Sequence, residues 1–438
     1  MKNILFLTYY LPPIRSVGVR RNYLVMQHLV PYFDQLFAIT TTNRHRLPIE
    51  NQSLDFVDVL EANTIDYRTI STWLKKDRVD VHFSEGSKTS RLGQFLVKLN
   101  RSFPFTLLWG EGGCVYIIHS FFIALKLIRR HKISHVYSSF LPYSDHAAAY
   151  LLKIFFPKLV WIADFRDLHV EPHYDIVFWR SFQHWCNRQI LKKADLVTTV
   201  SEGLAKHLRT YHSNVYVFQN GIAPLSKGVH SDSIDSQKSL TDIDYPSKFT
   251  ICYTGSLFGD ERNPSLIFTI VKDFVSEGLL NATNFQFVYA GKDTKLWLDW
   301  VERFGLTTFF KSYGMVSLDE AKRLQKTSHV NLLLTSATPE WTGVMTGKFY
   351  EYLAAQQPII VLINGTQDIE FETIMNKLNA GCVVYNDRSY DALRNYLLSL
   401  IHQFQQKGRV ESTVFIEKLK ELEWTFAVEK LMKRINKI

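Results

Sequence analysis

Short apolar runs alternate with helix-like stretches along most of this chain of 438 residues, and that alternation is the strongest constraint on its fold. In the first half, the predicted strands are 4–10, 36–42, 135–140, 159–164, 196–200 and 215–219. The predicted helices between them cover 19–30, 116–130, 144–156 and 177–193. Strands that alternate with helices are typical of α/β domains with parallel sheets. We therefore predict an α/β fold.

A second set of alternating elements follows. Its predicted strands are 249–253, 285–290, 309–313, 330–334, 358–363 and 382–385, and its predicted helices are 264–277, 318–326 and 348–355. The stretch 224–248 between the two sets is serine-rich and almost without apolar periodicity, which favours a linker or a surface loop. A chain of this length also exceeds a single ordinary core.

These patterns predict two facing, doubly wound, Rossmann-like domains with a ligand cleft at the carboxyl ends of both sets of strands. The predicted division is an N-terminal domain over 1–222, a linker over 223–248 and a C-terminal domain over 249–414. The last segment, 415–438, is predicted to be a helix that packs back on the N-terminal domain. Residues 66–101 are charged and irregular, and we assign them no secondary structure.

Composition narrows the class of protein. A hydrophobic fraction of 46% excludes general disorder. The net charge of +9 is compatible with nucleic acid, an anionic membrane or phosphorylated substrates. No nucleic-acid-binding signature with interleaved aromatic residues occurs, so we predict no nucleic-acid partner. The basic region 75–101 is either a solvated surface or a peripheral contact with anionic lipid.

The cysteines and the apolar runs indicate the cellular compartment of the protein. The four cysteines are scattered without metal-binding or redox spacing, which is typical of reduced thiols in a cytosolic protein. The chain opens directly on a strand, with no signal-peptide pattern. The most apolar helical stretch, 114–128, is interrupted by His119 and Ser120 and is too short to span a bilayer. We predict a cytoplasmic protein, with association at the inner face of the membrane left open.

The segment 346–355 (TGKFYEYLAA) carries the clearest functional signal. Gly347 allows backbone N–H groups to approach an anion at a helix start. Lys348 lies in the first helical turn, where a cation opposes the helix dipole and adds nothing evident to helix stability. Glu351 lies three residues on, on the same helix face. A cation and a carboxylate beside a helix N-terminus suit a ligand that carries both phosphate and hydroxyl groups.

Several further segments end predicted strands with polar or glycine residues. They are 10–21 (YLPPIRSVGVRR), 138–146 (SSFLPYSDH), 160–167 (VWIADFRD), 194–203 (ADLVTTVSEG), 218–222 (FQNGI) and 253–257 (YTGSL). Carboxylates at the carboxyl end of a parallel strand are placed for binding, although an Asp–Arg pair that fixes the loop is an alternative for 164–167. His146 is equally compatible with an ordinary hydrogen-bonded histidine. Arg20 and Arg21 suit either anion binding or a plain surface.

In their order along the chain, these segments resemble the GT-B glycosyltransferases, specifically family 4 of the retaining, sugar-nucleotide-dependent enzymes. The resemblance covers most of the chain and matches 66–101 weakly. It implies a nucleotide diphosphate sugar donor on the second domain, a glycan or lipid-linked acceptor on the first, and no metal or other cofactor. It also implies a role in cell-surface polysaccharide biosynthesis.

The resemblance assigns roles to individual residues. The implied catalytic residues are His146, Asp164, Arg262 and Lys348; the implied donor-binding residues are Gly18, Gly255, Arg262, Gly291, Thr342, Gly347, Lys348 and Glu351; the implied acceptor-binding residues are Arg20, Arg21 and Asp167. In such a site, Arg262 and Lys348 stabilise the departing nucleotide diphosphate. Glu351 binds the ribose hydroxyls.

One departure from the family pattern stands out. Members often carry two glutamates with seven residues between them, the first near the sugar and the second, matched by Glu351, on the ribose. The first position falls on Gly343. Sugar contacts then come from backbone groups and Thr342, or from Glu340, or the activity is altered.

Two metal-like patterns are discounted. Asp242 and Asp244 form a D-x-D pattern, but it lies in the polar linker, where a solvated loop is the better interpretation. His169, Glu171 and His173 alternate, yet a proline between them breaks any strand and no fourth ligand is near. Besides a transferase, the architecture leaves open a nucleotide-sugar 2-epimerase and a non-catalytic nucleotide-sugar-binding subunit.

Overall fold

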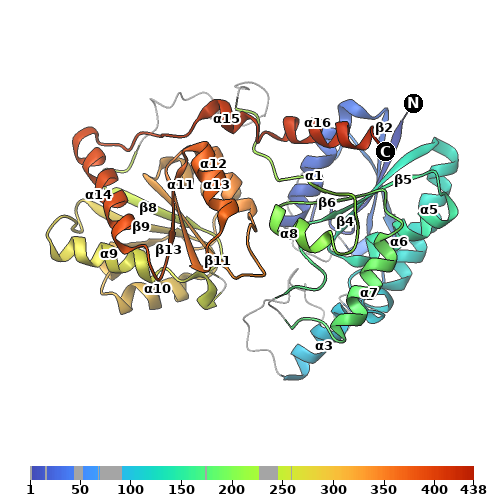
Figure 1. Cartoon of the computed structure of the whole chain (residues 1–438), viewed down its shortest axis with the longest axis horizontal. Helices are drawn as coiled ribbons and strands as arrows, with labels where there is room; N and C mark the ends of the chain where they lie inside the picture. Colours follow the sequence, from blue (N-terminus) through green and yellow to red (C-terminus); the bar gives the residue numbers. More distant parts are fainter. Residues whose placement is uncertain are drawn as a thin grey trace. The chain divides into compact units, whose positions relative to one another are not determined.

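The chain forms two compact units in the computed structural model (Figure 1). Unit 1 comprises Met1–Asn220 and Trp424–Ile438, and unit 2 comprises Gly221–Glu423. The structure describes residues 2–14, 17–43, 53–67, 69, 91–172, 175–225, 245–257 and 259–438. Most of the predicted linker, the Asp242–Asp244 pattern, His173 and the basic residues at 75–88 lie outside the described residues.

Unit 1 contains a parallel sheet of seven strands in the order β3-β2-β1-β4-β5-β6-β7. The strands are β1 (Asn3–Leu7), β2 (Gln35–Thr41), β3 (Asp58–Ala62), β4 (Ile133–Phe140), β5 (Val160–Phe165), β6 (Leu196–Thr199) and β7 (Val215–Val217). The α-helices are α1 (Val17–Leu29), α3 (Arg91–Arg101), α4 (Phe105–Leu108), α5 (Gly113–His131), α6 (Tyr143–Phe155), α7 (Arg180–Leu191), α8 (Glu202–Leu208) and α16 (Trp424–Ile435).

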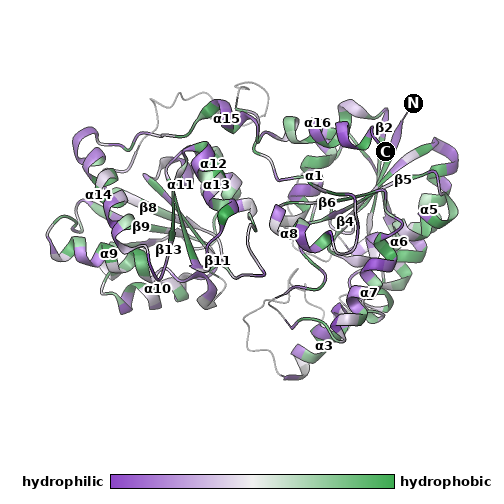
Figure 2. Ribbon diagram, viewed as in Figure 1, coloured by the Kyte–Doolittle hydropathy of each residue, from purple (hydrophilic) through white to green (hydrophobic). Residues whose placement is uncertain are grey.

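Helices cover both faces of this sheet (Figure 1). On one face, α1 and α16 pack over alternate strand residues in a core that includes Phe6, Ile162, Met26 and Leu431. Side chains at odd and even strand positions point to opposite faces. On the other face, Trp161 packs against His146 of α6. Figure 2 shows apolar strands in the interior of each unit and polar residues on the outer faces of most helices.

Unit 2 contains a parallel sheet of six strands in the order β10-β9-β8-β11-β12-β13. The strands are β8 (Phe249–Thr254), β9 (Phe285–Ala290), β10 (Phe310–Ser312), β11 (Val330–Ala337), β12 (Ile359–Gly365) and β13 (Gly381–Tyr385). The α-helices are α9 (Ser265–Ser276), α10 (Thr294–Arg303), α11 (Leu318–Thr327), α12 (Gly347–Ala355), α13 (Ile369–Leu378), α14 (Tyr390–Lys407) and α15 (Ile416–Lys420), and a 3-10 helix, η4, covers Gly259–Arg262.

The direction of strand addition reverses once in each sheet, between β1 and β4 in unit 1 and between β8 and β11 in unit 2. Loops leave such a point on both sides, so a crevice opens at the carboxyl ends of the strands. The predicted α/β fold with two doubly wound sheets is confirmed. None of the described helices combines the length and the apolarity that a membrane crossing requires.

Several elements differ from the sequence-based expectations. The first strand ends at Leu7, three residues earlier than predicted, and β3 and α3 fall where we assigned no structure. The segment 415–438 forms two helices: α15 belongs to unit 2, and only α16 packs in unit 1. The exit and return segments of the chain pair with each other within unit 2, where Ile222 N–H donates to Leu422 O at 2.9 Å.

The start of β13 tolerates no side chain. Gly381 has φ +135°, and a Cβ there would lie 2.0 Å from the carbonyl oxygen of its ladder partner Ile359. We expect Gly381→Ala to lower the free energy of unfolding by more than about 3 kcal/mol, because backbone strain and overpacking add. The control Gly305→Ala also has positive φ but has open space, and should cost about 1 kcal/mol. Equal midpoints in urea unfolding for the two variants would contradict this account.

Candidate functional site

In unit 2, the loop that follows β8 holds the predicted glycine close to the predicted lysine. Gly255 has φ +104°, and its N–H donates to Ala290 O at the end of β9 at 2.7 Å. A Cβ at this position would lie 2.8 Å from the Nζ of Lys348. Any side chain at position 255 would therefore displace the ammonium group of Lys348.

Arg262 and Lys348 converge on the hydroxyl of Tyr253. Lys348 Nζ donates to Tyr253 Oη at 3.1 Å and lies 4.2 Å from the centre of that ring. Arg262 Nη1 donates to Ser256 O at 2.6 Å and reaches Tyr253 Oη at 3.5 Å. Two cations from different elements, η4 and α12, thus share one tyrosine. The structure brings together the two residues that the sequence assigned to a diphosphate.

The two positive charges of this site, on Lys348 and Arg262, destabilise each other. Burial lowers the pKa of Lys348, and the nearby guanidinium of Arg262 lowers it further, whereas Tyr253 and Glu351 act in the opposite direction. Like charges that are brought together out of water destabilise each other. An anion bound between them would relieve that repulsion, so this corner of unit 2 is electrostatically suited to a phosphate group.

The helix α12 begins with the predicted segment. Gly347 is its first residue, and Thr346, the residue before it, makes no side-chain cap. Lys348 and Glu351 are both partly exposed and lie one turn apart. Gln325 of α11 donates to Glu351 Oε2 at 3.4 Å and to Thr254 Oγ1 at 2.9 Å, which orients the carboxylate next to the end of β8.

The departure at Gly343 has a backbone explanation. Gly343 has φ +69°, a left-handed conformation in which side chains other than glycine are strained. Its N–H donates to Asp368 Oδ2 at 2.8 Å, and the other oxygen of Asp368 caps α13 through Phe371 N–H. A glutamate at this position would strain the backbone. Thr342 and Glu340, the alternative sugar contacts, lie just before it, partly exposed and exposed respectively.

Gly291 closes the neighbouring loop. Its N–H donates to Gly314 O at 2.8 Å, and a Cβ on it would lie 2.5 Å from Gly255 O. The hydroxyl of Tyr289 donates to the same carbonyl at 3.0 Å. The carbonyl of Gly255 therefore lies against Gly291, and the close approach of these two loops requires a glycine at position 291.

Sequence reasoning missed the residues that hold this loop in place. Tyr253 is almost completely buried, and Asp293 accepts a hydrogen bond from Leu257 N–H at 2.9 Å. In the sequence, Tyr253 looks like an ordinary buried residue of a strand. The sequence pattern does not show that its hydroxyl group lies between two cations. Its place directly before Thr254 and Gly255, at the strand end, was the available signal.

In unit 1, Asp164 and Arg21 pair with each other in the interior. Arg21 Nε and Nη2 donate to the two oxygens of Asp164 at 3.1 and 3.0 Å, and Thr198 Oγ1 donates to Asp164 Oδ1 at 2.7 Å. Asp164 has no exposed surface, and Arg21 has 4%. Burial alone would raise the pKa of Asp164, but the charge and hydrogen bonds of Arg21 hold it below its ordinary value. Asp164 therefore forms an Asp–Arg pair that stabilises the fold, which was the alternative to a binding role, and its partner is Arg21.

His146 is also an interior group. It lies on α6 with no exposed surface, packed against Phe165 at 4.6 Å between ring centres, and its Nδ1 lies 2.7 Å from Ser138 Oγ. Burial lowers the pKa of His146 to about 3, so the ring is neutral. A molecule on the surface of unit 1 does not touch His146 or Asp164 in this conformation. Their direct contact with a sugar stays a prediction.

The remaining predicted residues of unit 1 lie near its surface or beneath a side chain. A Cβ on Gly18 would lie 1.7 Å from Nη1 of Arg166, so that guanidinium covers the glycine. Arg166 Nε is itself held by Phe140 O at 3.0 Å. Arg20 is partly exposed on α1, and Asp167 is exposed after β5.

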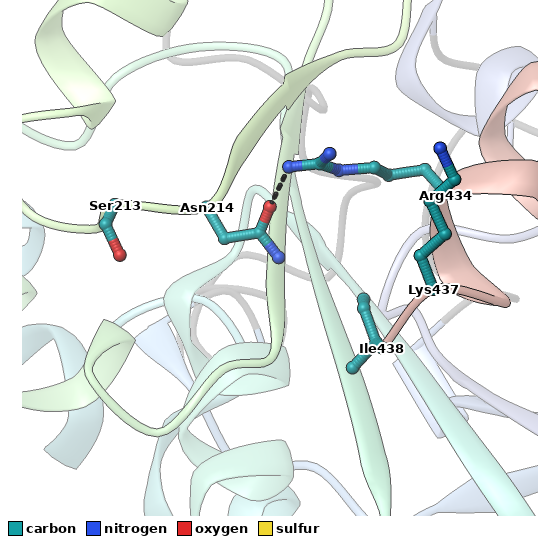
Figure 3. Close-up of a pocket in the computed structure, with 5 residues that line it drawn as sticks. All are labelled: Ser213, Asn214, Arg434, Lys437 and Ile438. Atoms are coloured by element: carbon teal, nitrogen blue, oxygen red, sulfur yellow. Dashed lines mark hydrogen bonds between the residues drawn. The ribbon is translucent and has the colours of Figure 1, made fainter.

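A surface pocket of about 330 Å³ lies elsewhere in unit 1 (Figure 3). It is lined by Ser213, Asn214, Arg434, Lys437 and Ile438, and Arg434 Nη2 donates to Asn214 Oδ1 at 2.6 Å. Asn214 directly precedes β7, so the pocket adjoins the amino end of that strand, whereas the predicted residues follow carboxyl ends. Within the described ranges, no three His, Cys, Asp or Glu side chains gather as a metal site would require.

Two doubly wound parallel α/β units in one chain define the GT-B fold, the architecture of two-domain glycosyltransferases. Residues 67–224 match the model of the family described as Glycosyltransferase Family 4. The comparison with curated protein sequences returned no match.

Solved structures of similar fold include a glycosyltransferase from Rickettsia africae ESF-5, with 13% identity and a TM-score of 0.58 over 100% of this chain and 98% of that one. A sucrose-phosphate synthase from Thermosynechococcus elongatus has 11% identity and a TM-score of 0.61 over 100% and 99%. The lipopolysaccharide outer core galactosyltransferase WaaB has 10% identity and a TM-score of 0.58 over 99% of each chain. At sequence identities of 10–13%, this structural similarity establishes the fold of the chain.

The buried ion pair of unit 1 gives a stability prediction. Arg21→Ala leaves the Asp164 carboxylate buried without its main partner, and we expect a loss of about 3–5 kcal/mol in the free energy of unfolding. Arg20→Ala, at the neighbouring, partly exposed position, should cost under about 1 kcal/mol. Urea unfolding of both variants tests this, and similar midpoints for the two would rule out a dominant role for the ion pair.

Buried histidines of unit 1 give a pH prediction. Burial lowers the pKa of His135 and His169 to about 4 and that of His146 to about 3, whereas burial raises the pKa of Asp145 to about 7. The unfolded histidines gain protons below pH 6.5, so their stabilising contribution falls as the pH drops from 6.5 toward 4.

Asp145 works in the opposite direction, because its contribution is full below its unfolded pKa of 3.8 and is lost as the pH rises through 7. With three histidines against one aspartate, we expect the thermal midpoint to decrease between pH 6.5 and pH 4, and His169→Gln to make that decrease shallower. A thermal midpoint that is flat or rises toward acid over this range would contradict the assignment.

Proposed function

We propose that this protein is a retaining glycosyltransferase that moves a sugar, of hexose type, from a nucleotide diphosphate sugar to a glycan or lipid-linked acceptor. The single observation that carries the proposal is the convergence of Arg262 and Lys348 on Tyr253 at the strand ends of unit 2. The family match over 67–224 and the GT-B fold support a transferase. The role we propose is in cell-surface polysaccharide biosynthesis, in the cytoplasm.

The donor's diphosphate binds the two cations. Arg262 lies on η4 and Lys348 in the first turn of α12, so both charges stand where backbone N–H groups at the start of α12 also favour an anion. As the sugar leaves, negative charge grows on the departing diphosphate, and fixed cations stabilise that charge with little reorganisation. The donor site needs no metal in this proposal, because the cations perform that role.

The ribose hydroxyls bind Glu351. Its carboxylate is one helical turn from Lys348 and is oriented by Gln325, so a nucleotide whose phosphate meets Lys348 brings its ribose near Glu351. Gly255 and Gly291 lie at the strand ends beside Lys348, and Gly347 begins the helix that carries Lys348 and Glu351. The sugar is contacted by backbone groups or Thr342, since position 343 has no side chain.

The acceptor binds unit 1. Arg20 and Asp167 are the accessible members of the predicted acceptor set, and Arg21 fixes the fold behind them through Asp164. Retention proceeds by front-face displacement: the departing phosphate takes the proton of the acceptor hydroxyl while the new glycosidic bond forms on the same face of the sugar.

Substitutions in the donor site test the proposal. We expect Lys348→Ala and Glu351→Ala each to lower kcat/KM for sugar transfer by about a hundredfold or more, since each removes a charged contact with the donor. Lys377→Ala, which removes an exposed lysine of α13 in the same unit, should leave transfer unchanged.

The same variants separate binding from folding. Nucleoside diphosphates should raise the thermal midpoint of the wild-type protein and of Lys377→Ala, because they bind the folded state, and raise it much less in Lys348→Ala. Normal transfer by both site variants would refute the site assignment. Conversion of a donor sugar without any acceptor would identify an epimerase, and nucleotide binding with neither reaction would identify a non-catalytic subunit.

A further inference from the structure

Unit 1 exposes a group of large apolar side chains on two helices. They are Phe95 and Leu96 of α3, Trp179 just before α7, and Phe182 and Trp185 of α7, with exposed fractions between 43% and 61%. We call these five residues the α3–α7 face. Single exposed apolar residues are ordinary, but a contiguous group on one surface marks an interaction site.

Specific contacts join the end of α3 and the residues that follow it to the start of α7 and the residues that precede it. Phe178 N–H donates to Ser102 Oγ at 2.7 Å, and Phe103 N–H donates to Gln183 Oε1 at 2.7 Å. The rings of Phe95 and Phe178 lie 5.3 Å apart between centres. These contacts fix the end of α3 beside the start of α7, and the two helices lie side by side in unit 1 (Figure 1).

The exposed rings of α7 share one side of that helix. Phe182 and Trp185 are three residues apart and stack with their centres 5.8 Å apart. The opposite side of the helix, which includes Gln183 and Asn187, is buried in unit 1. The indole and phenyl rings therefore point away from the core and stabilise nothing inside it.

The two stretches of chain that carry this face are mainly basic. The stretches 91–101 and 175–193 contain seven basic residues, namely Arg91, Lys98, Arg101, Arg180, Arg188, Lys192 and Lys193. They contain one acidic residue, Asp175, which pairs with Lys98. Neither α3 nor α7 contains an Asp or a Glu. An excess of positive charge therefore surrounds the exposed aromatic residues.

We propose that the α3–α7 face docks unit 1 on an anionic lipid surface. Indole rings favour the boundary between headgroups and acyl chains, where one side of the ring is apolar and the other is wet. Lysine and arginine side chains beside them would meet lipid phosphates, each contributing attraction that salt screens. A second copy of this chain fits less well, because two such faces would bring like charges together. The docking is independent of the proposed transferase activity.

Vesicle co-sedimentation of the full chain, without any substrate, tests this docking. The protein should bind vesicles of equimolar phosphatidylglycerol and phosphatidylcholine, and bind vesicles of phosphatidylcholine alone much more weakly. Added salt should weaken the binding. Equal binding to both vesicles, or none to either by the folded protein, would overturn the proposal.

Variants locate the contact. Trp179→Ser combined with Trp185→Ser should lower the partition coefficient on anionic vesicles about tenfold or more, because two exposed rings lose their burial in the interface. Arg188→Gln combined with Lys192→Gln should lower it by a similar factor and make it less sensitive to salt. Circular dichroism confirms that each variant keeps its fold, which is expected since all four side chains are exposed.

A matched control lies on the other face of the unit 1 sheet. Phe426 of α16 is 38% exposed and has the ammonium of Lys430 4.3 Å from its ring centre, so it offers the same chemistry elsewhere. Phe426→Ser should leave vesicle binding unchanged. Three outcomes would each refute docking of lipid by the α3–α7 face. The first is an equal loss of vesicle binding with Phe426→Ser, and the second is unchanged binding by the double tryptophan variant. The third is a dimer of the wild-type protein in solution that the double tryptophan variant abolishes.

Discussion

The Arg21 guanidinium connects parts of unit 1 that are far apart in the sequence. Besides Asp164, it donates to Phe218 O at 2.9 Å and to Asn220 Oδ1 at 2.8 Å, and it lies 5.8 Å from the ring centre of Trp424. Asn220 is the last residue before the chain leaves unit 1, and Trp424 is the residue at which it returns. A buried cation has to keep its partners, so the exit and the return are fixed by one side chain.

The strand pattern was predictable because buried parallel strands are short, apolar and bounded by polar residues. The elements that we did not predict, β3 and α3, lack this pattern for physical reasons. β3 (Asp58–Ala62) is an edge strand with one fully buried residue, so its sequence contains no apolar run. α3 has no fully buried residue among its described side chains, and its placement depends on α7, which lies more than seventy residues further along the chain.

The candidate site of unit 2 could be predicted from the sequence because it lies where a strand ends and a helix begins. The burial of Asp164 in unit 1 was harder to predict, because its side chain points into the interior. Asp164 is two residues after Ile162, whose side chain packs in the core beneath α1 and α16. Residues two apart in a strand share a face, so Asp164 also points toward α1, where Arg21 neutralises it. The presence of a carboxylate at a strand end indicated binding, but the strand's alternation, read together with α1, favoured an interior ion pair.

The glycines of unit 2 give a backbone reason for the absence of a glutamate at position 343. At position 255, a side chain would push away the ammonium of Lys348, so that glycine preserves a cation. At position 343, the left-handed backbone lets the N–H reach Asp368, which also caps α13. A glutamate at 343 would cost about 1–2 kcal/mol in that conformation or would break the contact with Asp368. The missing carboxylate is thus tied to the local backbone and to α13, while the cations, Tyr253 and Glu351 are assembled independently of it.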